Sequence, residues 1–232
     1  DRSKPKSIRG IHVRQNYQQL NFFPIQCYEF RCDKFLLDTT LGLLKGLEYR
    51  SFNEPTGVLT SSDIHQKKSF SPLMSWFQEC VDTVHIDTGL SCDRLVVNKA
   101  WANKSTAGSG HHHDAHRHPM SYYSGIFYLT QGAPTVFIDP LFQREWGSFY
   151  LDGTVNRELG YHGGAGGLLL FPSYMIHASA PNKEDVDRYS MAFNTFPSGD
   201  INLGGHGLPM ARVKTEGWKD LGPLNLDEYA RD

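Results

Sequence analysis

The sequence predicts a mainly β protein with flanking helices, organised as a β-sandwich or jelly roll. Two segments with helical periodicity come early in the chain, and short segments of strand composition follow at regular intervals, separated by turn residues. A chain of 232 residues, 39% of them hydrophobic, can bury a substantial core within one domain. Helices that precede a run of short strands are typical of a sheet covered by helices.

Two helices are expected ahead of most of the strands. Asp33 caps the first, and leucines recur behind it at helical spacing. Ser71 and Pro72 begin the second, with Pro72 in the first helical position, and Gly89 ends it. Residues 51–69, between the two helices, are polar and rich in turn residues, so we expect a loop there.

The expected strands are rich in β-branched and aromatic residues. They are, in chain order, an extended segment from Leu20 to Cys32, then residues 93–103, 122–130, 133–140, 168–171, 175–177 and 188–196. Residues 104–110 and 163–167 are expected to form loops, and residues 142–160 an excursion over one mouth of the sheet.

The segment between Leu20 and Pro197 contains no internal repeat and no stretch of linker composition. We therefore expect a single domain over residues 20–198. Residues 1–19 are expected to form a flexible, basic N-terminal arm, and residues 199–232 a C-terminal tail or peripheral wrap.

Composition argues against several classes of protein. A formal net charge of −2 does not favour binding to nucleic acid through a basic surface, and no apolar run approaches the length of a transmembrane helix. The polar, basic start of the chain is not a signal peptide. The cysteines lack zinc-type spacing and are expected to be reduced, buried thiols in a cytoplasmic protein. They are Cys27, Cys32, Cys80 and Cys92.

Histidines are concentrated in one stretch, since five of the 11 lie within Gly110–Pro119. Neutral imidazole is a common metal ligand, and two histidines at i and i+2 on a strand point to the same face. His116 and His118 have this spacing, and His177 follows 59 residues after His118, which leaves room for strands to return to the same pocket. We therefore predict a three-histidine metal site with positions open for substrate and oxygen.

Arg188 and Ser190 share one face of the last expected strand, beginning 11 residues after His177. A guanidinium with a neighbouring hydroxyl offers a bidentate clamp for a carboxylate. Because the rest of this strand is largely apolar, Arg188 is interpreted as an anchor for a small dicarboxylate.

Several segments, in this order, resemble the Fe(II)- and 2-oxoglutarate-dependent oxygenase superfamily. They are Phe22-Phe23-Pro24; Trp101-Ala102-Asn103; His116–Pro119 running on to Ser124–Leu129; Asp139-Pro140; Gly167–His177; and Arg188–Asn194. The resemblance covers about residues 20–197. It is strongest to the small, largely uncharacterised 2OG-Fe(II) oxygenases of bacteria and phages.

The resemblance implies a double-stranded β-helix (a jelly roll, cupin-like) that holds Fe(II), with 2-oxoglutarate chelating the metal through its keto-acid end. The implied metal ligands are His116, His118 and His177. The implied 2-oxoglutarate contacts are Arg188, which takes the far carboxylate, with Ser190, Tyr128 and Asn103, and with Ser124 as a lesser candidate. No catalytic residue is expected beyond the metal centre.

The implied activity is that of a non-haem iron dioxygenase, a prolyl-hydroxylase-like hydroxylase. Such an enzyme couples oxidative decarboxylation of 2-oxoglutarate to oxidation of a second substrate. The expected partners are 2-oxoglutarate, O₂ and an unidentified small-molecule or peptide substrate, with no membrane and no nucleic acid. The loops at residues 51–69, 104–113 and 141–165 are expected to shape specificity.

The chain departs from the superfamily at one ligand. The wider superfamily uses His-x-Asp or His-x-Glu, whereas the matching positions here are His116 and His118. His112-His113-Asp114 also has the His-x-Asp pattern, so Asp114 is the reserve carboxylate ligand in place of His116 or His118. The three upstream histidines, His111–His113, are expected to line the entrance.

Two alternatives remain open from the sequence. A cupin-type metalloprotein without 2-oxoglutarate would account for Gly110 and the His-x-His pair six residues later, but the cupin glutamate would fall at Tyr122 or Tyr123. The cupin pattern also leaves Arg188 and its neighbouring serine unexplained. A non-enzymatic β-sandwich binding module would bind metal without turning over 2-oxoglutarate.

Overall fold

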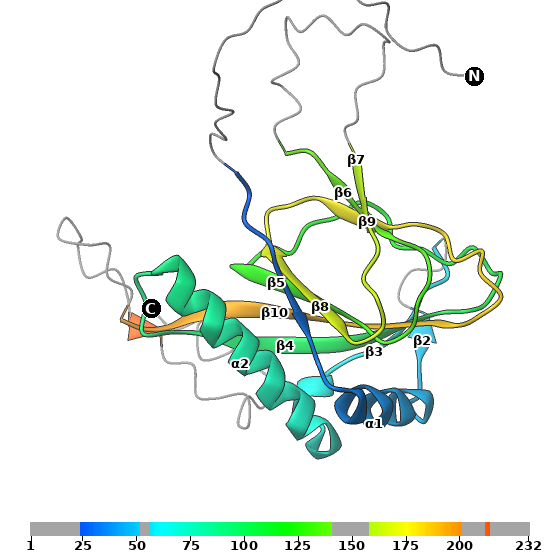
Figure 1. The fold of residues 1–232 in the computed structure, drawn as a ribbon, viewed down its shortest axis with the longest axis horizontal. Helices are drawn as coiled ribbons and strands as arrows, with labels where there is room; N and C mark the ends of the chain where they lie inside the picture. The colour runs from blue at the N-terminus through cyan, green and yellow to red at the C-terminus, as the bar shows by residue number, and fades with distance from the viewer. Residues whose placement is uncertain (1–23, 52–55, 141–157, 201–211, 214–232) are drawn as a thin grey trace, which may run out of the picture.

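Two antiparallel sheets face each other and enclose the interior of a jelly roll (Figure 1). The structure, a computed structural model, describes residues 24–51, 56–140, 158–200 and 212–213. The larger sheet runs in the order β1 (Tyr28–Arg31), β8 (Gly167–Pro172), β5 (Tyr123–Tyr128), β10 (Arg188–Asp200), β4 (Arg94–Ser105), β3 (Leu59–Ser61) and β2 (Arg50–Ser51), with β11 (Arg212–Val213) paired to β10. The smaller sheet consists of β7 (Glu158–Tyr161), β6 (Thr135–Ile138) and β9 (His177–Ser179).

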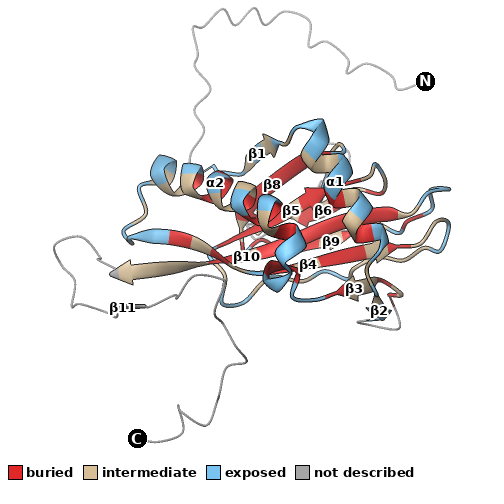
Figure 2. Ribbon diagram, turned by 90° about the horizontal axis from the view of Figure 1, so that it is seen from below, coloured by how far each residue is buried: buried red, intermediate tan, exposed pale blue. Residues whose placement is uncertain are grey.

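Both expected helices are present, and they cover one face of the larger sheet (Figure 2). The helix α1 (Lys34–Lys45) begins after Asp33, whose side chain accepts a hydrogen bond from the Leu36 amide at 2.8 Å. The helix α2 (Ser71–Thr88) has Pro72 in its first turn. It ends at Gly89, whose φ of 61° is a left-handed conformation that favours glycine. The mainly β class with flanking helices is confirmed.

The strand β10 contributes side chains both to the core between the larger sheet and the helices and to the cavity between the two sheets. Met191 and Phe193 belong to the core between the larger sheet and the helices, and the Phe193 ring centroid lies 4.5 Å from that of Phe77 on α2. Arg188 and Ser190 alternate with them and line a cavity between the two sheets. Because strand side chains alternate between faces, one strand both anchors the helices and supplies polar groups to the jelly roll.

A β-bulge in β4 maintains this division. The register with β10 shifts so that Lys99 and Val97 have successive partners and Asn98 is the extra residue. One inserted residue reverses the alternation, so that Val97 lies in the helix-side core together with Ala100 and Ala102. Trp101 therefore faces the cavity while both halves of the strand bury apolar residues against the helices.

The expectation of a loop over residues 51–69 is wrong in part. Residues 59–61 form β3, which pairs with β4, and two 3-10 turns follow at Ile64–Gln66 and Lys68–Phe70. A three-residue strand is too short to show a period of two in the sequence, so its pairing depends on the edge that β4 offers. The strand β4 likewise continues past its predicted end to Ser105, because β3 and β10 hold it on both sides.

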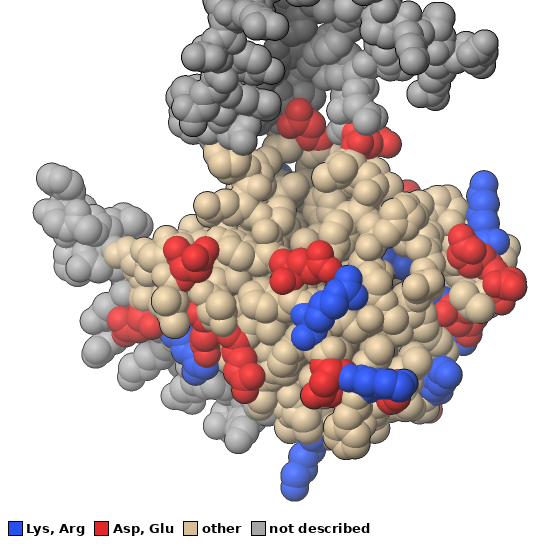
Figure 3. Space-filling model, viewed as in Figure 1, with Lys and Arg blue, Asp and Glu red and all other residues tan. Residues whose placement is uncertain are grey.

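All four cysteines are free, as expected, but only Cys80 is buried, and burial raises the pKa of its thiol to about 12. Cys27 is exposed, so the expectation of buried thiols is wrong there. No helix within the described residues is long and apolar enough to cross a membrane. On the face shown in Figure 3, basic and acidic side chains are interspersed.

Some sequence expectations fall outside the described residues. These are the N-terminal arm at residues 1–19, the aromatic pair Phe22-Phe23, most of the excursion at residues 142–160 and most of the tail at residues 199–232. The strand β10 continues to Asp200, just beyond the expected domain end at residue 198.

Gly125 on β5 lies opposite Phe193 on β10, and a Cβ at this glycine would lie 2.3 Å from the Phe193 ring. We expect Gly125→Ala to lower the free energy of unfolding by about 1–3 kcal/mol, because the ring or the strands must move. Chemical denaturation measures this change. Gly42→Ala in α1, where nothing lies within 4 Å, is the control and should be neutral or stabilising by up to about 1 kcal/mol. Equal stability of the two variants would contradict the packing argument.

Candidate metal centre

Backbone pairing brings two of the predicted ligands together. His116 and His177 form an isolated antiparallel bridge in which each backbone amide donates to the other residue's carbonyl at 2.9 Å. The backbone amide of His118 donates to the Ser173 carbonyl at 3.2 Å. The segment before β5 is therefore held against β9 and the segment that leads into it, so that His177 becomes a neighbour of His116 and His118.

The three imidazoles converge with the spacing of ligands to one ion. Their candidate ligand nitrogens all lie within 4.8 Å of one another, and the Nε2 atoms of His118 and His177 are 3.3 Å apart. Two nitrogens bound at right angles to one ion, at about 2.1 Å each, are about 3.0 Å apart. His116 completes the group, with its ring centroid 4.4 Å from that of His177. The geometry fits a three-histidine metal site.

Backbone carbonyls set the tautomers of two of these rings. The Nδ1 atom of His116 lies 2.7 Å from the Asp114 carbonyl oxygen, and the Nδ1 atom of His177 lies 3.1 Å from the Met175 carbonyl oxygen. A carbonyl only accepts, so each Nδ1 carries the proton and each Nε2 keeps a lone pair for a metal. Such contacts also fix the orientation of the ring.

Burial keeps two of the imidazoles neutral, as metal ligation requires. Loss of hydration lowers the pKa of His118 to about 3, and the charges of His177, His116 and His113 act in the same direction. Loss of hydration also lowers the pKa of His177 to about 4, although its hydrogen bond to the Met175 carbonyl opposes the shift. These groups are unprotonated at neutral pH, ready to bind a cation.

Asp114, the reserve ligand, does not join this group. Its side chain is 70% exposed, and its carboxylate lies 3.5 Å from His112 Nε2 rather than beside the three histidines. Only its backbone carbonyl serves the site, through His116. The set His116, His118 and His177 therefore remains the proposed ligand set.

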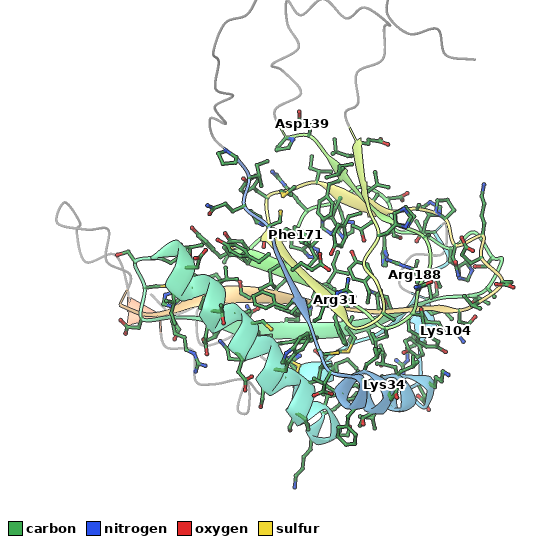
Figure 4. The ribbon with its side chains drawn as sticks, in the orientation of Figure 1. Arg31, Lys34, Lys104, Asp139, Phe171 and Arg188 are labelled. Atoms are coloured by element: carbon green, nitrogen blue, oxygen red, sulfur yellow. The ribbon has the colours of Figure 1, made fainter. Side chains whose placement is uncertain are left out.

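Arg188 is the only cation among the residues described as lining the cavity, the histidines aside, and it is 5% exposed. Within the described part of the chain its guanidinium has no hydrogen-bond or ion-pair partner, and its Cζ atom lies 6.0 Å from the centroid of the Tyr128 ring. Burial lowers the pKa of Arg188, and Tyr128 partly offsets this. Figure 4 shows Arg188 within the ring of strands. A buried guanidinium of this kind is stabilised by a bound anion.

Two of the other predicted contacts, Ser190 and Asn103, also line the cavity, whereas Tyr128 is not among its described lining residues and lies against Arg188 instead. Ser190 is paired across the sheet with Asn103 on one side and Tyr128 on the other. The Tyr128 hydroxyl bonds to Thr135 Oγ1 at 2.8 Å, and the Asn103 side-chain oxygen accepts from Thr60 at 3.0 Å. These hydrogen bonds orient both side chains from within the protein.

Ser124 does not line the cavity, and its hydroxyl bonds to Ser173 at 2.8 Å instead. Its part is to hold the segment that carries His118, since His118 donates to the same Ser173. The expectation of a lesser 2-oxoglutarate contact at Ser124 stays a prediction without support from its position.

Several residues were missed as cavity residues by the sequence reasoning. The Trp101 ring lies 5.5 Å from that of His118, and Thr135, Ile126 and Ser179 complete the wall. No acidic side chain is among the described residues that line this cavity. Because side chains alternate along a strand, the sequence could have placed Trp101 on the same face as Asn103. Only the strand register shows which other strands contribute residues to the cavity.

Comparisons with known proteins agree with this geometry. Residues 99–194, which include all three histidines and Arg188, match a family described as "Putative 2OG-Fe(II) oxygenase". A comparison with curated proteins gives no match.

Among solved structures, the chain is similar to the non-heme alpha ketoglutarate dependent epimerase SnoN from nogalamycin biosynthesis, with 12% identity, a TM-score of 0.60, and coverage of 83% of this chain and 92% of that one. It is similar to a Pseudomonas putida prolyl-4-hydroxylase, with 13% identity, a TM-score of 0.55, and coverage of 75% and 94%. It is also similar to HygX from Streptomyces hygroscopicus with nickel, 2-oxoglutarate and hygromycin B bound, with 12% identity, a TM-score of 0.53, and coverage of 75% and 83%. The double-stranded β-helix fold is confirmed.

Removing a ligand tests the metal centre directly. We expect His118→Ala to weaken Co(II) or Zn(II) binding by more than about 100-fold, because loss of a residue that only hydrogen-bonds to a metal ligand already costs about 10–100-fold. Asp114→Ala should change the affinity by less than about threefold, since its carboxylate points away. Isothermal titration calorimetry measures both variants. The reverse order of effects would assign the second ligand to Asp114.

Acid should destabilise the metal-free protein. The imidazoles of His118 and His177 bind protons near pH 3 and 4 in the folded state but near 6.5 when unfolded. Between about pH 4 and 6.5 the unfolded chain binds more protons, so the free energy of unfolding falls as the pH falls through that window and levels off above it. Denaturation curves at pH 7.5, 6 and 5 measure this slope. His118→Phe should flatten it, and an unchanged slope would contradict the assignment.

Proposed function

We propose that this 2OG-Fe(II) oxygenase is a hydroxylase that holds Fe(II) on His116, His118 and His177 and binds the far carboxylate of 2-oxoglutarate at Arg188. Ser190 and Asn103 line the same cavity, and the Tyr128 ring lies 6.0 Å from the guanidinium carbon; all three are proposed to assist Arg188. O₂ and a separate substrate complete the set of reactants.

One observation carries the proposal: a buried guanidinium, with no hydrogen-bond or ion-pair partner among the described residues, lines the same cavity as the three candidate metal ligands. Burying an unpaired charge costs several kcal/mol, which favours a ligand that supplies the missing anion. A metal and a separate cation in the same cavity match a small dicarboxylate with a chelating end. 2-Oxoglutarate has this form.

Fe(II) with 2-oxoglutarate supplies the oxidising chemistry, in which the co-substrate becomes succinate and CO₂ and a C–H bond is hydroxylated. The chain contributes positions and surroundings. Carbonyl-locked tautomers present the Nε2 atoms of His116 and His177, and the Arg188 side chain sets the direction of the co-substrate. Apolar atoms of Trp101, Ile126 and Ala192 in the wall keep water away.

The substrate proposed is a small molecule or a peptide. The solved neighbours differ widely in this respect: one is titled an epimerase, one a prolyl-4-hydroxylase, and one was crystallised with hygromycin B. Fold likeness therefore favours no single substrate. A cytoplasmic location is proposed as well, in keeping with the free cysteines.

The cupin and binding-module alternatives lack an explanation for Arg188. Anaerobic titration of the Fe(II)-loaded protein with 2-oxoglutarate should produce a metal-to-ligand charge-transfer band, followed on admission of O₂ by slow succinate formation. A metal-binding protein with neither band nor succinate would favour the cupin. A band without succinate under any condition would favour the binding module.

Arg188→Met tests the anchor, because methionine retains much of the volume without the charge. We expect 2-oxoglutarate affinity to fall by about 30-fold or more, while metal affinity changes little. Without ligand, the free energy of unfolding should be unchanged or higher, since a buried unpaired charge is removed. Arg31→Met, at an exposed position on β1, is the control for both measurements. Loss of metal binding in Arg188→Met would show that Arg188 supports the metal site instead.

A further inference from the structure

His113 is a fourth imidazole in the cavity that the proposed metal set leaves unused. It lines the same space as the three candidate ligands and Arg188, with its ring centroid 5.9 Å from that of His116. It is not part of the group whose ligand nitrogens lie within 4.8 Å of one another. His113 can therefore contact a ligand bound in the cavity, although it is not one of the candidate metal ligands.

Backbone pairing holds His113 on the wall formed by β9. Its amide donates to Ser179 Oγ at 2.7 Å, and the Ser179 amide donates to the His113 carbonyl at 3.1 Å. His177 lies two residues before Ser179 on the same strand, so both face the cavity. His113 is therefore fixed beside the metal site by the strand that supplies the third histidine.

The same contacts are compatible with the tautomer of His113 whose proton lies on Nε2. Ser179 Oγ already accepts from the His113 amide, which leaves its own hydrogen free to donate to His113 Nδ1, 3.5 Å away. With Nδ1 accepting, the proton lies on Nε2. Among the described residues, Nε2 has no hydrogen-bond partner, and its ring lines the cavity.

Burial keeps this ring neutral. Loss of hydration lowers the pKa of His113 to about 4, followed by the charges of His116, Arg188 and His177. The charges of His116 and Arg188 both lower the pKa of His113, in agreement with the place of all three residues in one cavity. A neutral imidazole with its proton on Nε2 donates one hydrogen bond to an anion and adds no second charge to that of Arg188.

We propose that His113 Nε2–H, oriented by Ser179, donates a hydrogen bond to a carboxylate oxygen of bound 2-oxoglutarate and so completes the co-substrate site on the wall opposite β10. This inference rests on the proposed function. It adds a recognition residue held against β9 of the smaller sheet to the contacts from β4, β5 and β10, so that both sheets support the co-substrate site. The affinity for 2-oxoglutarate therefore depends on how the two sheets pack against each other.

His113→Phe removes the donor and keeps a ring of similar shape. Using Ni(II)-loaded protein and calorimetry, we expect the dissociation constant for 2-oxoglutarate to rise about tenfold, as for loss of a hydrogen bond to a charged group. The dissociation constant for Ni(II) alone should stay within about threefold. His113→Gln, which retains an N–H donor, should recover most of the 2-oxoglutarate affinity. This recovery separates a hydrogen bond from a packing role.

His112→Phe is the matched control, because this neighbouring imidazole faces Asp114 rather than the cavity. It should leave both dissociation constants unchanged. Weaker Ni(II) binding in His113→Phe would overturn the proposal in favour of a fourth metal ligand. Unchanged 2-oxoglutarate affinity in His113→Phe would overturn it as well. If wild type itself binds no 2-oxoglutarate, the proposed function fails, a result distinct from failure of the His113 contact alone.

Discussion

The two-residue bridge between His116 and His177 is the contact on which the site depends. Two hydrogen bonds of 2.9 Å join segments that are separated in the sequence by the strands β5, β6, β7 and β8. They bring the His116 ring within 4.4 Å of the His177 ring, and carbonyls next to the same segments set the tautomers. Backbone pairing is well suited to this task, because it positions side chains without using their polar atoms.

The larger sheet provides the rigid support for that bridge. Its strand β10 packs Met191 and Phe193 against the helices and turns Arg188 and Ser190 into the cavity. The bulge at Asn98 lets β4 keep the same division despite its length. Apolar burial on one face thus fixes the position of polar groups on the other, which is how a well-packed core supports a binding site.

The electrostatics of the cavity are those of a receptor for an anion. Its described wall carries a guanidinium and several histidines but no carboxylate, and burial holds three of those imidazoles neutral. An all-histidine ligand set leaves the full charge of a divalent ion uncompensated by the protein. A bound dicarboxylate would balance the charges of both the proposed metal and Arg188.

The sequence by itself determined the residue types and their local faces. Asp33, Pro72 and Gly89 marked the helices, and the spacing of His116, His118, Arg188 and Ser190 defined the candidate site. These signals are local, since capping chemistry and the period of a strand depend only on neighbouring residues. The family resemblance rested on the same local segments.

The tertiary structure decided which side chains and segments lie next to one another. It turned Asp114 outward, placed His113 against Ser179, removed Ser124 from the cavity and made a strand of residues 59–61. Each outcome depends on register between segments distant in the sequence, and register is set by burial of whole sheet faces rather than by any local pattern. The sequence could thus name Asp114 and His118 as rival ligands, but only the pairing of His116 with His177 and of His118 with Ser173 separated them.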